Sequence, residues 1–419
     1  MTGFSPLPIQ GKKPQYFILL TVFLDVVGFG LVAPVLPALI RGLSTSAQSQ
    51  AQWIGILMAL YAVMQFFFTP ILGALSDRFG RKPVLLLSLL GLAAGEFIHA
   101  CATSLAALVF ARLLTGCTSA TIAVANSYMA DVTRPDQRAA AFGKIGAAFS
   151  LGFIIGPMAG GLLGEVDIRM PFYAAGALAV LNALYGLLVL PESLPAAKRN
   201  PLKWHNMSPF NAIADLKLLR NASGLAPIIA LSICAQAILQ SVWVMYTETR
   251  FGWTPKDNGG MLLAIGLLSV LTEGWLLGKL LPRWGEQRLT LIALLSASAS
   301  FLLFALAWQP WMMYAIALIT CMSALSAPIL QGLVSADADA ERQGATMGAL
   351  GAINSIMMVA APLLGTFAFS MVNHMPAGDW RLGSSFLLSF AIQSVALLLA
   401  VLHFNKRKPV ATTSAKLPN

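Results

Sequence analysis

Long apolar stretches recur from one end of this 419-residue chain to the other, and they limit its possible folds more than any other feature. Only 11% of the residues are charged, against about a quarter in soluble domains. A helix needs about 20 mainly apolar residues to cross a bilayer. We therefore expect an all-α integral membrane protein with twelve spans, at 16–39, 53–75, 84–102, 105–129, 140–163, 172–190, 225–247, 261–281, 289–308, 310–334, 345–371 and 384–404.

The longest polar stretch between spans runs from 191 to 224 and divides the spans into two groups of six. Its composition is typical of a linker, and its FNAIADLKLLRN segment predicts a short amphipathic helix. The predicted organisation is an N-terminal six-helix bundle over 1–190, a cytoplasmic linker over 191–224 and a C-terminal six-helix bundle with a short cytoplasmic tail over 225–419. The first span is expected to anchor the chain rather than to be cleaved.

Basic residues are distributed unevenly between the two sides of these spans. If both termini are cytoplasmic, 21 of the 27 lysines and arginines lie in cytoplasmic segments, and only Arg112 lies inside a span. Lysine and arginine concentrate on the cytoplasmic side of membrane proteins, so this orientation is predicted. It also explains the net charge of +10 without a nucleic-acid partner. The five basic residues outside are Arg41, Arg169, Arg250, Lys256 and Arg381.

Two pairs of segments repeat at one spacing. GALSDRFGRKP at 73–83 and GKLLPRWGEQR at 278–288 share a glycine, an arginine and a second glycine, 205 residues apart. Pro157 in GFIIGPMAGG and Pro362 in MVAAPLLG are separated by the same 205 residues. A duplicated six-helix unit with a substrate site between the copies is a transporter architecture. The chain has no GxxxxGK[ST] segment, so we expect no nucleotide to drive it.

These motifs resemble those of the major facilitator superfamily. GALSDRFGRKP is similar to the loop after its second helix, ARLLTG at 111–116 to its fourth helix, and GFIIGPMAGG at 152–161 to the fifth helix of its proton-driven exporters. LDVVGFGLVAPVLP at 24–37, the segment 59–86 and YTETRFGW at 246–253 resemble the tetracycline/proton antiporter family.

The resemblance implies two pseudo-symmetric six-helix bundles in a bacterial inner membrane. It also implies a monomeric antiporter that exports an amphipathic drug against protons by alternating access, with a tetracycline-like substrate as the first choice. A tetracycline would arrive as a chelate of a divalent metal; no other cofactor and no protein-bound metal is expected. The alternative is a proton symporter, or an exporter of a small metabolite, with the same fold. An enzyme is not expected, because no catalytic constellation is evident.

Gating is predicted for residues of three motifs. In the loop after the second span, Gly73 would let a helix approach, Gly80 would permit a tight turn and Asp77 would sit at a helix N-terminus. The glycines of 152–161 would pack one span against the other half and seal the cavity. The full set, which includes an Arg81–Asp131 ion pair, is Gly73, Asp77, Arg78, Gly80, Arg81, Arg112, Asp131, Gly152, Gly156, Pro157 and Gly160.

Charges inside spans are costly, so they are functional candidates, with a structural ion pair as the alternative for each. Asp25, Glu96 and Glu273 are predicted to couple protons, because protons and a cationic substrate can compete for one buried carboxylate. His99 lies three residues after Glu96, on the same side of a helix. Polar residues that could line the substrate cavity are Gln65, Asn126, Gln236, Gln240, Gln331 and Asn354.

The chain departs from the tetracycline antiporter pattern at four positions. Ala297 and Ser269 stand where that family has an aspartate and a histidine, and Gly95 stands where it has another aspartate, with Glu96 immediately after. Glu273 stands where the family has a glutamine. Either proton coupling has moved to Glu273, or the substrate is no longer a tetracycline.

Overall fold

A computed structural model describes residues 12–134, 137–199, 224–337 and 343–406. Every regular element within these ranges is a helix. Eleven helical stretches in the described chain are long and apolar enough to cross a membrane. The longest, Pro255–Leu306, is broken at Gly285, where φ is 73° and ψ is 161°, so it contains two predicted spans. The predicted all-α, twelve-span fold is confirmed, while the amphipathic helix predicted in the linker lies outside the described residues.

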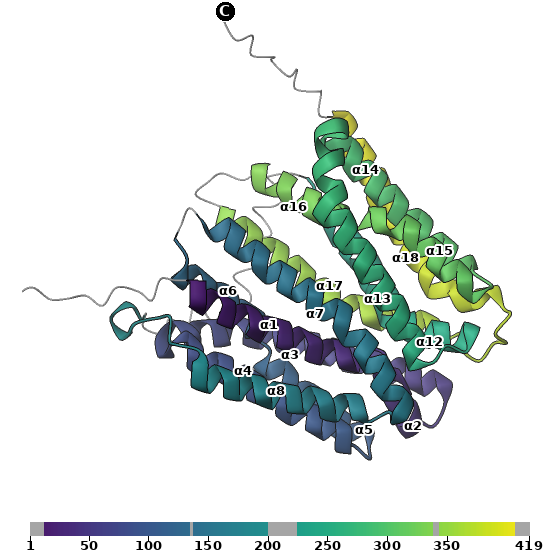
Figure 1. Cartoon of the computed structure of the whole chain (residues 1–419). Helices are drawn as coiled ribbons and strands as arrows, with labels where there is room; N and C mark the ends of the chain where they lie inside the picture. Colours follow the sequence, from purple (N-terminus) through teal and green to yellow (C-terminus); the bar gives the residue numbers. More distant parts are fainter. Residues whose placement is uncertain (1–11, 135–136, 200–223, 338–342, 407–419) are drawn as a thin grey trace, which may run out of the picture.

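Figure 1 shows two groups of helices that lie side by side. The N-terminal half contains α1 (Lys12–Val32), α2 (Leu36–Leu43), α3 (Ala47–Phe79), α4 (Arg81–Cys101), α5 (Leu105–Thr118), α6 (Thr121–Val132), α7 (Arg138–Val166), α8 (Met170–Val189) and η2 (Ala196–Lys198). The C-terminal half contains α12 (Ala226–Phe251), α13 (Pro255–Leu271), η3 (Thr272–Leu276), α14 (Leu277–Leu306), α15 (Pro310–Ser323), α16 (Ser326–Asp337), α17 (Gln343–Ser370), η4 (Trp380–Gly383) and α18 (Ser384–Lys406). The domain boundaries drawn between α8 and α12 stay a prediction.

The sequence repeat is also a repeat of backbone geometry. Gly80, between α3 and α4, has φ 109° and ψ 161°, close to the values at Gly285, 205 residues later. The fourth span is interrupted at 119–120, between α5 and α6, and the tenth at 324–325, between α15 and α16, again 205 residues apart. The two halves therefore turn and break at equivalent positions.

The hydrophobic core joins the two halves at one end of the molecule only. One cluster combines Val35 and Leu36 of the N-terminal half with Trp253 and Phe304 of the C-terminal half. At the other end, separate clusters lie within the N-terminal and the C-terminal half. We call the shared-core end, which carries Arg41 and Glu248, the closed end, and the end that carries Gly80 and Gly285 the open end.

At the closed end, the backbones of the two halves nearly touch. A Cβ atom added to Gly161 of α7 would lie 3.0 Å from the Cα atom of Lys256 in α13. A Cβ atom added to Gly55 of α3 would lie 3.1 Å from the Cβ atom of Thr366 in α17. Figure 1 accordingly shows the ends of α7 and α13 next to each other, and α3 likewise packs against α17.

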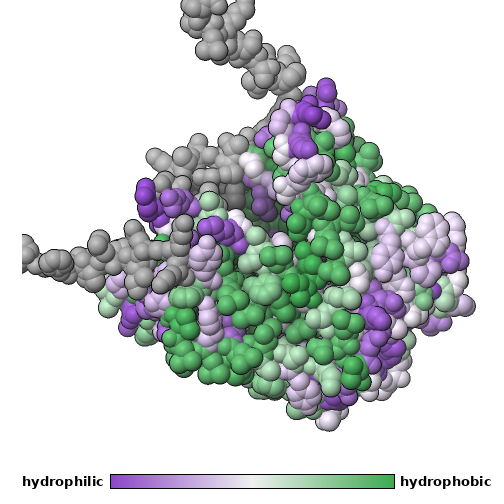
Figure 2. All heavy atoms as spheres, in the orientation of Figure 1, coloured by the Kyte–Doolittle hydropathy of each residue, from purple (hydrophilic) through white to green (hydrophobic). Residues whose placement is uncertain are grey.

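The open end lacks such contacts. A Cβ atom added to Gly73, Gly143, Gly146 or Gly278 would meet no atom within 4 Å. The close helix approach predicted at Gly73 is therefore wrong for this conformation, because the facing helices of the two halves diverge there. Figure 2 shows hydrophobic residues over the middle of the molecule and hydrophilic residues towards its two ends, as expected of a protein that crosses a membrane.

Candidate functional site

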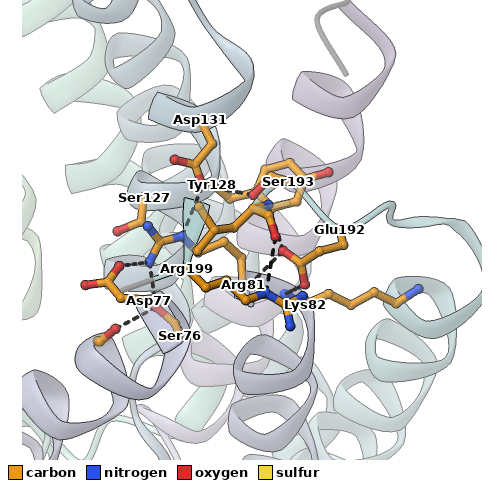
Figure 3. Close-up of polar contacts among 12 residues, drawn as sticks. Ser76, Asp77, Arg81, Lys82, Ser127, Tyr128, Asp131, Glu192, Ser193 and Arg199 are labelled. Carbon is orange, nitrogen blue, oxygen red and sulfur yellow. Dashed lines mark hydrogen bonds and ion pairs between the residues drawn. The ribbon is translucent and has the colours of Figure 1, made fainter. Parts of the chain in front are cut away.

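Arg81, the first residue of α4, is the centre of a polar cluster at the open end (Figure 3). Its side chain is buried and forms an ion pair with Asp77. Its Nε donates to Asp131 Oδ2 at 3.0 Å, and its Nη1 donates to Ser76 Oγ at 2.8 Å. The predicted Arg81–Asp131 ion pair is thus present. Arg78 lies apart from these contacts, with its guanidinium 5.5 Å from the centre of the Phe79 ring.

Glu192, just after α8, completes this cluster (Figure 3). Its carboxylate accepts hydrogen bonds from the backbone N–H groups of Arg81, at 2.9 Å, and Lys82, at 3.2 Å. The first N–H groups of a helix have no partner within the helix and form its positive end, so a carboxylate stabilises them. We expected Asp77 at a helix N-terminus, but at the start of α4 Glu192 takes that place.

The chain that leaves α8 is bound to the same cluster. The hydroxyl of Ser193 donates to Asp131 Oδ2 at 3.0 Å, and the hydroxyl of Tyr128 in α6 donates to the carbonyl of Pro191 at 2.9 Å. We call Ser76, Asp77, Arg81, Asp131, Glu192 and Ser193 the polar clamp. Sequence reasoning missed its last two members, because PESLP was interpreted as linker. The signal available was a carboxylate placed directly after a span.

The glycine stripe of α7 faces α1 of its own half. A Cβ atom added to Gly156 would lie 2.8 Å from the Cα atom of Gly30, and one added to Gly152 would lie 2.9 Å from the Cβ atom of Val26. Gly160 likewise lies against Leu31. The prediction that this stripe packs against the other half is wrong.

A neighbouring face of α7, adjacent to the glycine stripe, contacts the other half. A Cβ atom added to Gly259 of α13 would lie 3.1 Å from the Cα atom of Met158, and Gly161 lies against Pro255. Pro157, inside α7, has its backbone beside Gly259. Small residues on two adjacent faces therefore let α7 pack closely between α1 and α13.

Asp25 lies at a helix start inside the N-terminal half. Thr121, the first residue of α6, donates through Oγ1 to Asp25 Oδ1 at 3.3 Å. The helix α6 begins there because the fourth span is interrupted at 119–120. The positive end of a half-helix inside a membrane favours an anionic group, so this position suits the Asp25 carboxylate.

The interruption between α5 and α6 is held by polar residues of α3. The hydroxyl of Tyr61 lies 2.8 Å from Ser119 Oγ, and Gln65 Nε2 donates to the same oxygen at 2.9 Å. Thr69 donates to the Ser119 carbonyl at 3.2 Å. Gln65, predicted to line the substrate cavity, therefore lies near the interruption that also positions Asp25.

Glu96, His99 and Arg112 are buried in the N-terminal half. His99 Nδ1 lies 3.3 Å from Glu96 Oε2, both on α4. The guanidinium of Arg112, on α5, lies 5.9 Å from the centre of the Tyr61 ring. Of the predicted charges, Arg112 thus lies beside Tyr61, whose hydroxyl also contacts Ser119 at the interruption.

Glu273 lies apart from this group, in the C-terminal half. It belongs to η3, a five-residue π-helical turn, a feature that is frequent at functional sites. Gly259, Gly266 and Glu273 recur every seven residues and so share one helix face. Gly259 and Gly266 contact α7, at Pro157 and Ile154, so this face continues towards the open end at the exposed Glu273.

Comparison with known proteins assigns this arrangement to a family. Residues 18–362 match the Major Facilitator Superfamily. The chain belongs to this superfamily. It is 36% identical over 392 residues to the class C tetracycline resistance protein of Escherichia coli, an alignment that covers 93% of this chain and 96% of the relative. It is 37% identical over 407 residues to the class D tetracycline resistance protein of Salmonella ordonez, covering 96% and 100% of the two chains.

The fold agrees with this assignment. The nucleoside transporter NupG superposes with a TM-score of 0.75 at 16% identity, over 94% of this chain and all of that one, a likeness of fold alone. The Major Facilitator Superfamily comprises membrane transporters, so the predicted family and fold class are confirmed. The protein is a multi-pass membrane protein.

Several amide side chains are exposed within the spans of this transporter. Gln236 and Gln240, one turn apart on α12, are exposed, as are Gln331 on α16 and Asn354 on α17, while Asn126 on α6 is half-buried. A polar group facing lipid would lack a hydrogen-bond partner, so exposed amides are expected to face the space between the halves. Their assignment to a substrate cavity stays a prediction.

Proposed function

We propose that this protein is a proton-coupled antiporter of a bacterial inner membrane that exports an amphipathic drug by alternating access. The single observation that supports this most strongly is the asymmetry of the two ends, with one core shared between the halves at the closed end and separate cores at the open end. Such a molecule offers a central site to one side of the membrane at a time. The protein would act as a monomer, without chemical change to its substrate.

The open end is proposed to face the cytoplasm. It carries the basic residues of the loops at Gly80 and Gly285, and basic residues concentrate on the cytoplasmic side of membrane proteins. This conformation would then be the inward-open state, which receives the drug from the cell. Both chain termini would be cytoplasmic.

Asp25 is the proposed site of competition between proton and drug. Its carboxylate lies at the start of α6, on a span that packs along α7, and Gln65 lies near the same interruption. A cationic group of the drug would bind the carboxylate from the cytoplasm. A proton from outside would then neutralise the carboxylate and release the drug. Glu96, with Arg112, and Glu273 are proposed to modulate this exchange through their charges.

A tetracycline, as a chelate of a divalent metal, is the first candidate substrate, because relatives at 36–37% identity are named tetracycline resistance proteins. The substitutions at Ala297 and Ser269 favour a second candidate, a different amphipathic cation, because they remove a charge and an imidazole from the C-terminal half. A symporter or an exporter of a small metabolite with the same fold is the alternative function.

Transport into everted membrane vesicles tests the proposal. An imposed proton gradient, acidic inside, should drive accumulation of labelled tetracycline with magnesium, and accumulation should collapse with a protonophore. Asp25→Asn should reduce it to background, because the neutral side chain can no longer exchange a proton.

Asp379→Asn is the matched control. Hydrogen bonds from Arg381 lower the pKa of Asp379 to about 2, so this carboxylate, just outside the last span, keeps its charge at any pH of the assay. The control should transport like the wild type. Gradient-driven movement of the drug in the direction of proton flow would establish a symporter instead, and wild-type transport by Asp25→Asn would remove Asp25 from the mechanism.

A further inference from the structure

An exposed stripe of apolar residues on α13 ends in an aromatic and basic face at the open end. Leu267, Leu271 and Trp275 follow one another at one-turn intervals and are 51%, 61% and 60% exposed. One turn further, Lys279 places its Nζ 3.7 Å from the centre of the Trp275 ring, and Arg283 follows after another turn. The order of apolar, tryptophan and basic residues is typical of the boundary between hydrocarbon and headgroups.

In the equivalent loop of the N-terminal half, the charged side chains bind other residues of the protein. There, Arg81 is buried and bound by Asp77 and Asp131, and Glu192 accepts from the backbone. In the second copy, Pro282 stands in place of Asp77 and Glu286 in place of Arg81, 205 residues on. The polar clamp therefore has no counterpart built from these two positions.

The basic residues of the second loop remain available to an external anion. Lys279, Arg283 and Arg288 are exposed, and in the described part of the chain none of them forms an ion pair. Glu286 is the one acidic residue in the segment 277–288. Figure 2 shows hydrophilic residues gathered at the tip formed by the start of α14, directly above a hydrophobic surface.

We propose that Trp275, Lys279 and Arg283 form a binding face for the headgroup of an anionic phospholipid in the cytoplasmic leaflet. The two cations would hold the phosphate, while the Trp275 ring would lie at headgroup depth and the leucines of α13 against the acyl chains. A lipid fits this face better than a soluble anion, because the cations directly continue an exposed apolar stripe against which acyl chains can pack. The proposal rests on the cytoplasmic orientation of the open end, but lipid binding is measured independently of transport.

Charge should dominate this binding. A basic residue near an anionic leaflet contributes about 1 kcal/mol, or about fivefold in affinity. The double variant Lys279→Gln/Arg283→Gln should therefore bind phosphatidylglycerol about 25-fold more weakly than the wild type. Lys279→Arg/Arg283→Lys, which keeps both charges, should bind like the wild type.

The experiment measures phosphatidylglycerol and phosphatidylcholine retained by the purified full-length protein, by native mass spectrometry during lipid titration. Size-exclusion chromatography checks that each variant is folded. Arg138→Gln/Lys144→Gln is the matched control, because it removes two exposed cations from α7 at the same end of the other half. It should lower the phosphatidylglycerol affinity clearly less than Lys279→Gln/Arg283→Gln does, because only the cations of α14 adjoin Trp275. Unchanged phosphatidylglycerol binding by Lys279→Gln/Arg283→Gln, or an equal loss in the α7 control, would overturn the proposal.

Discussion

Glu192 connects two segments that are far apart in the sequence, the start of α4 and the chain after α8. Its carboxylate accepts from the backbone of Arg81 and Lys82 at the start of α4, and it also accepts from the N–H of Leu194 at 3.0 Å, which orders the chain after α8. Arg81 in turn binds Asp131 at the end of α6. The Glu192 carboxylate thus fixes the start of α4 and the beginning of the connection between the halves, and the Arg81 side chain adds the end of α6.

Glu192→Gln should destabilise the protein by about 1–3 kcal/mol, because a charge-assisted bond to the helix start is lost and one acceptor becomes a donor. The thermal unfolding temperature of the purified protein in detergent measures this effect. Glu286→Gln is the control, since the exposed Glu286 side chain makes no hydrogen bond among the described residues. Equal unfolding temperatures for Glu192→Gln and the control would contradict the role given to Glu192.

Two structural constraints favour glycine at position 80, and one favours it at the counterpart, position 285. Both have positive φ, which costs other residues about 1–2 kcal/mol. Only at Gly80 would a Cβ atom also crowd the Glu192 carboxylate, 2.8 Å from its Cδ; at Gly285 it would meet open space. Gly80→Ala should therefore lower the unfolding temperature more than Gly285→Ala. Indistinguishable losses would show that backbone strain alone acts at Gly80.

At the scale of helices, a residue pattern predicts a face but not the neighbour of that face. Glycines at 152, 156 and 160 correctly indicate a close contact, yet the same stripe could meet α1 or α13 with equal chemistry. The interruption at Ser119–Ala120 was missed for a related reason. Neither residue is a glycine or proline. From α3, Thr69 donates to the Ser119 carbonyl and Gln65 donates to the Ser119 hydroxyl, which no local pattern reveals.

Gly156→Ala tests the contact of α7 with α1. A methyl group there would lie 2.8 Å from the Cα atom of Gly30 and from the Val27 carbonyl, so the helices must separate, at a cost of about 1–3 kcal/mol. Unfolding temperature and drug transport should both fall. Gly146→Ala, on the same helix, meets open space and should leave the unfolding temperature unchanged or raise it. Equal behaviour of the two variants would contradict the close packing of Gly156.

Some features of the whole molecule can be predicted from its sequence, and others cannot. Span count, repeat and family follow from hydrophobicity and motifs, because these depend on composition and spacing. The conformation does not, since the same sequence must visit states that are open at either end. The sequence also does not reveal which polar side chains meet across the halves. Examples are the ion pair of Arg41 in α2 with Glu248 in α12, and the hydrogen bond that Thr254 donates to Glu165 of α7 at 2.9 Å.

The Arg41–Glu248 ion pair joins the halves only while the closed end stays closed, so its charges should bias the balance between the two states. Arg41→Glu places two negative charges together and should favour separation of the halves there. An exposed pair contributes about 0.2–1 kcal/mol and the new repulsion adds a similar amount, so the ratio of inward-open to outward-open molecules should fall several-fold. The readout is the rate at which a cysteine placed at Gly278, at the open end, reacts with a thiol reagent.

That rate should fall in Arg41→Glu and return to the starting value in Arg41→Glu/Glu248→Arg, which restores the pair in reverse. The recovery is the decisive part, because a general defect of the Arg41 substitution would persist in the double variant. High salt should shrink the difference between single variant and wild type, since the pair is partly exposed. If reversal of both charges fails to recover the rate, the pair is a contact of the closed end without influence on which end is open.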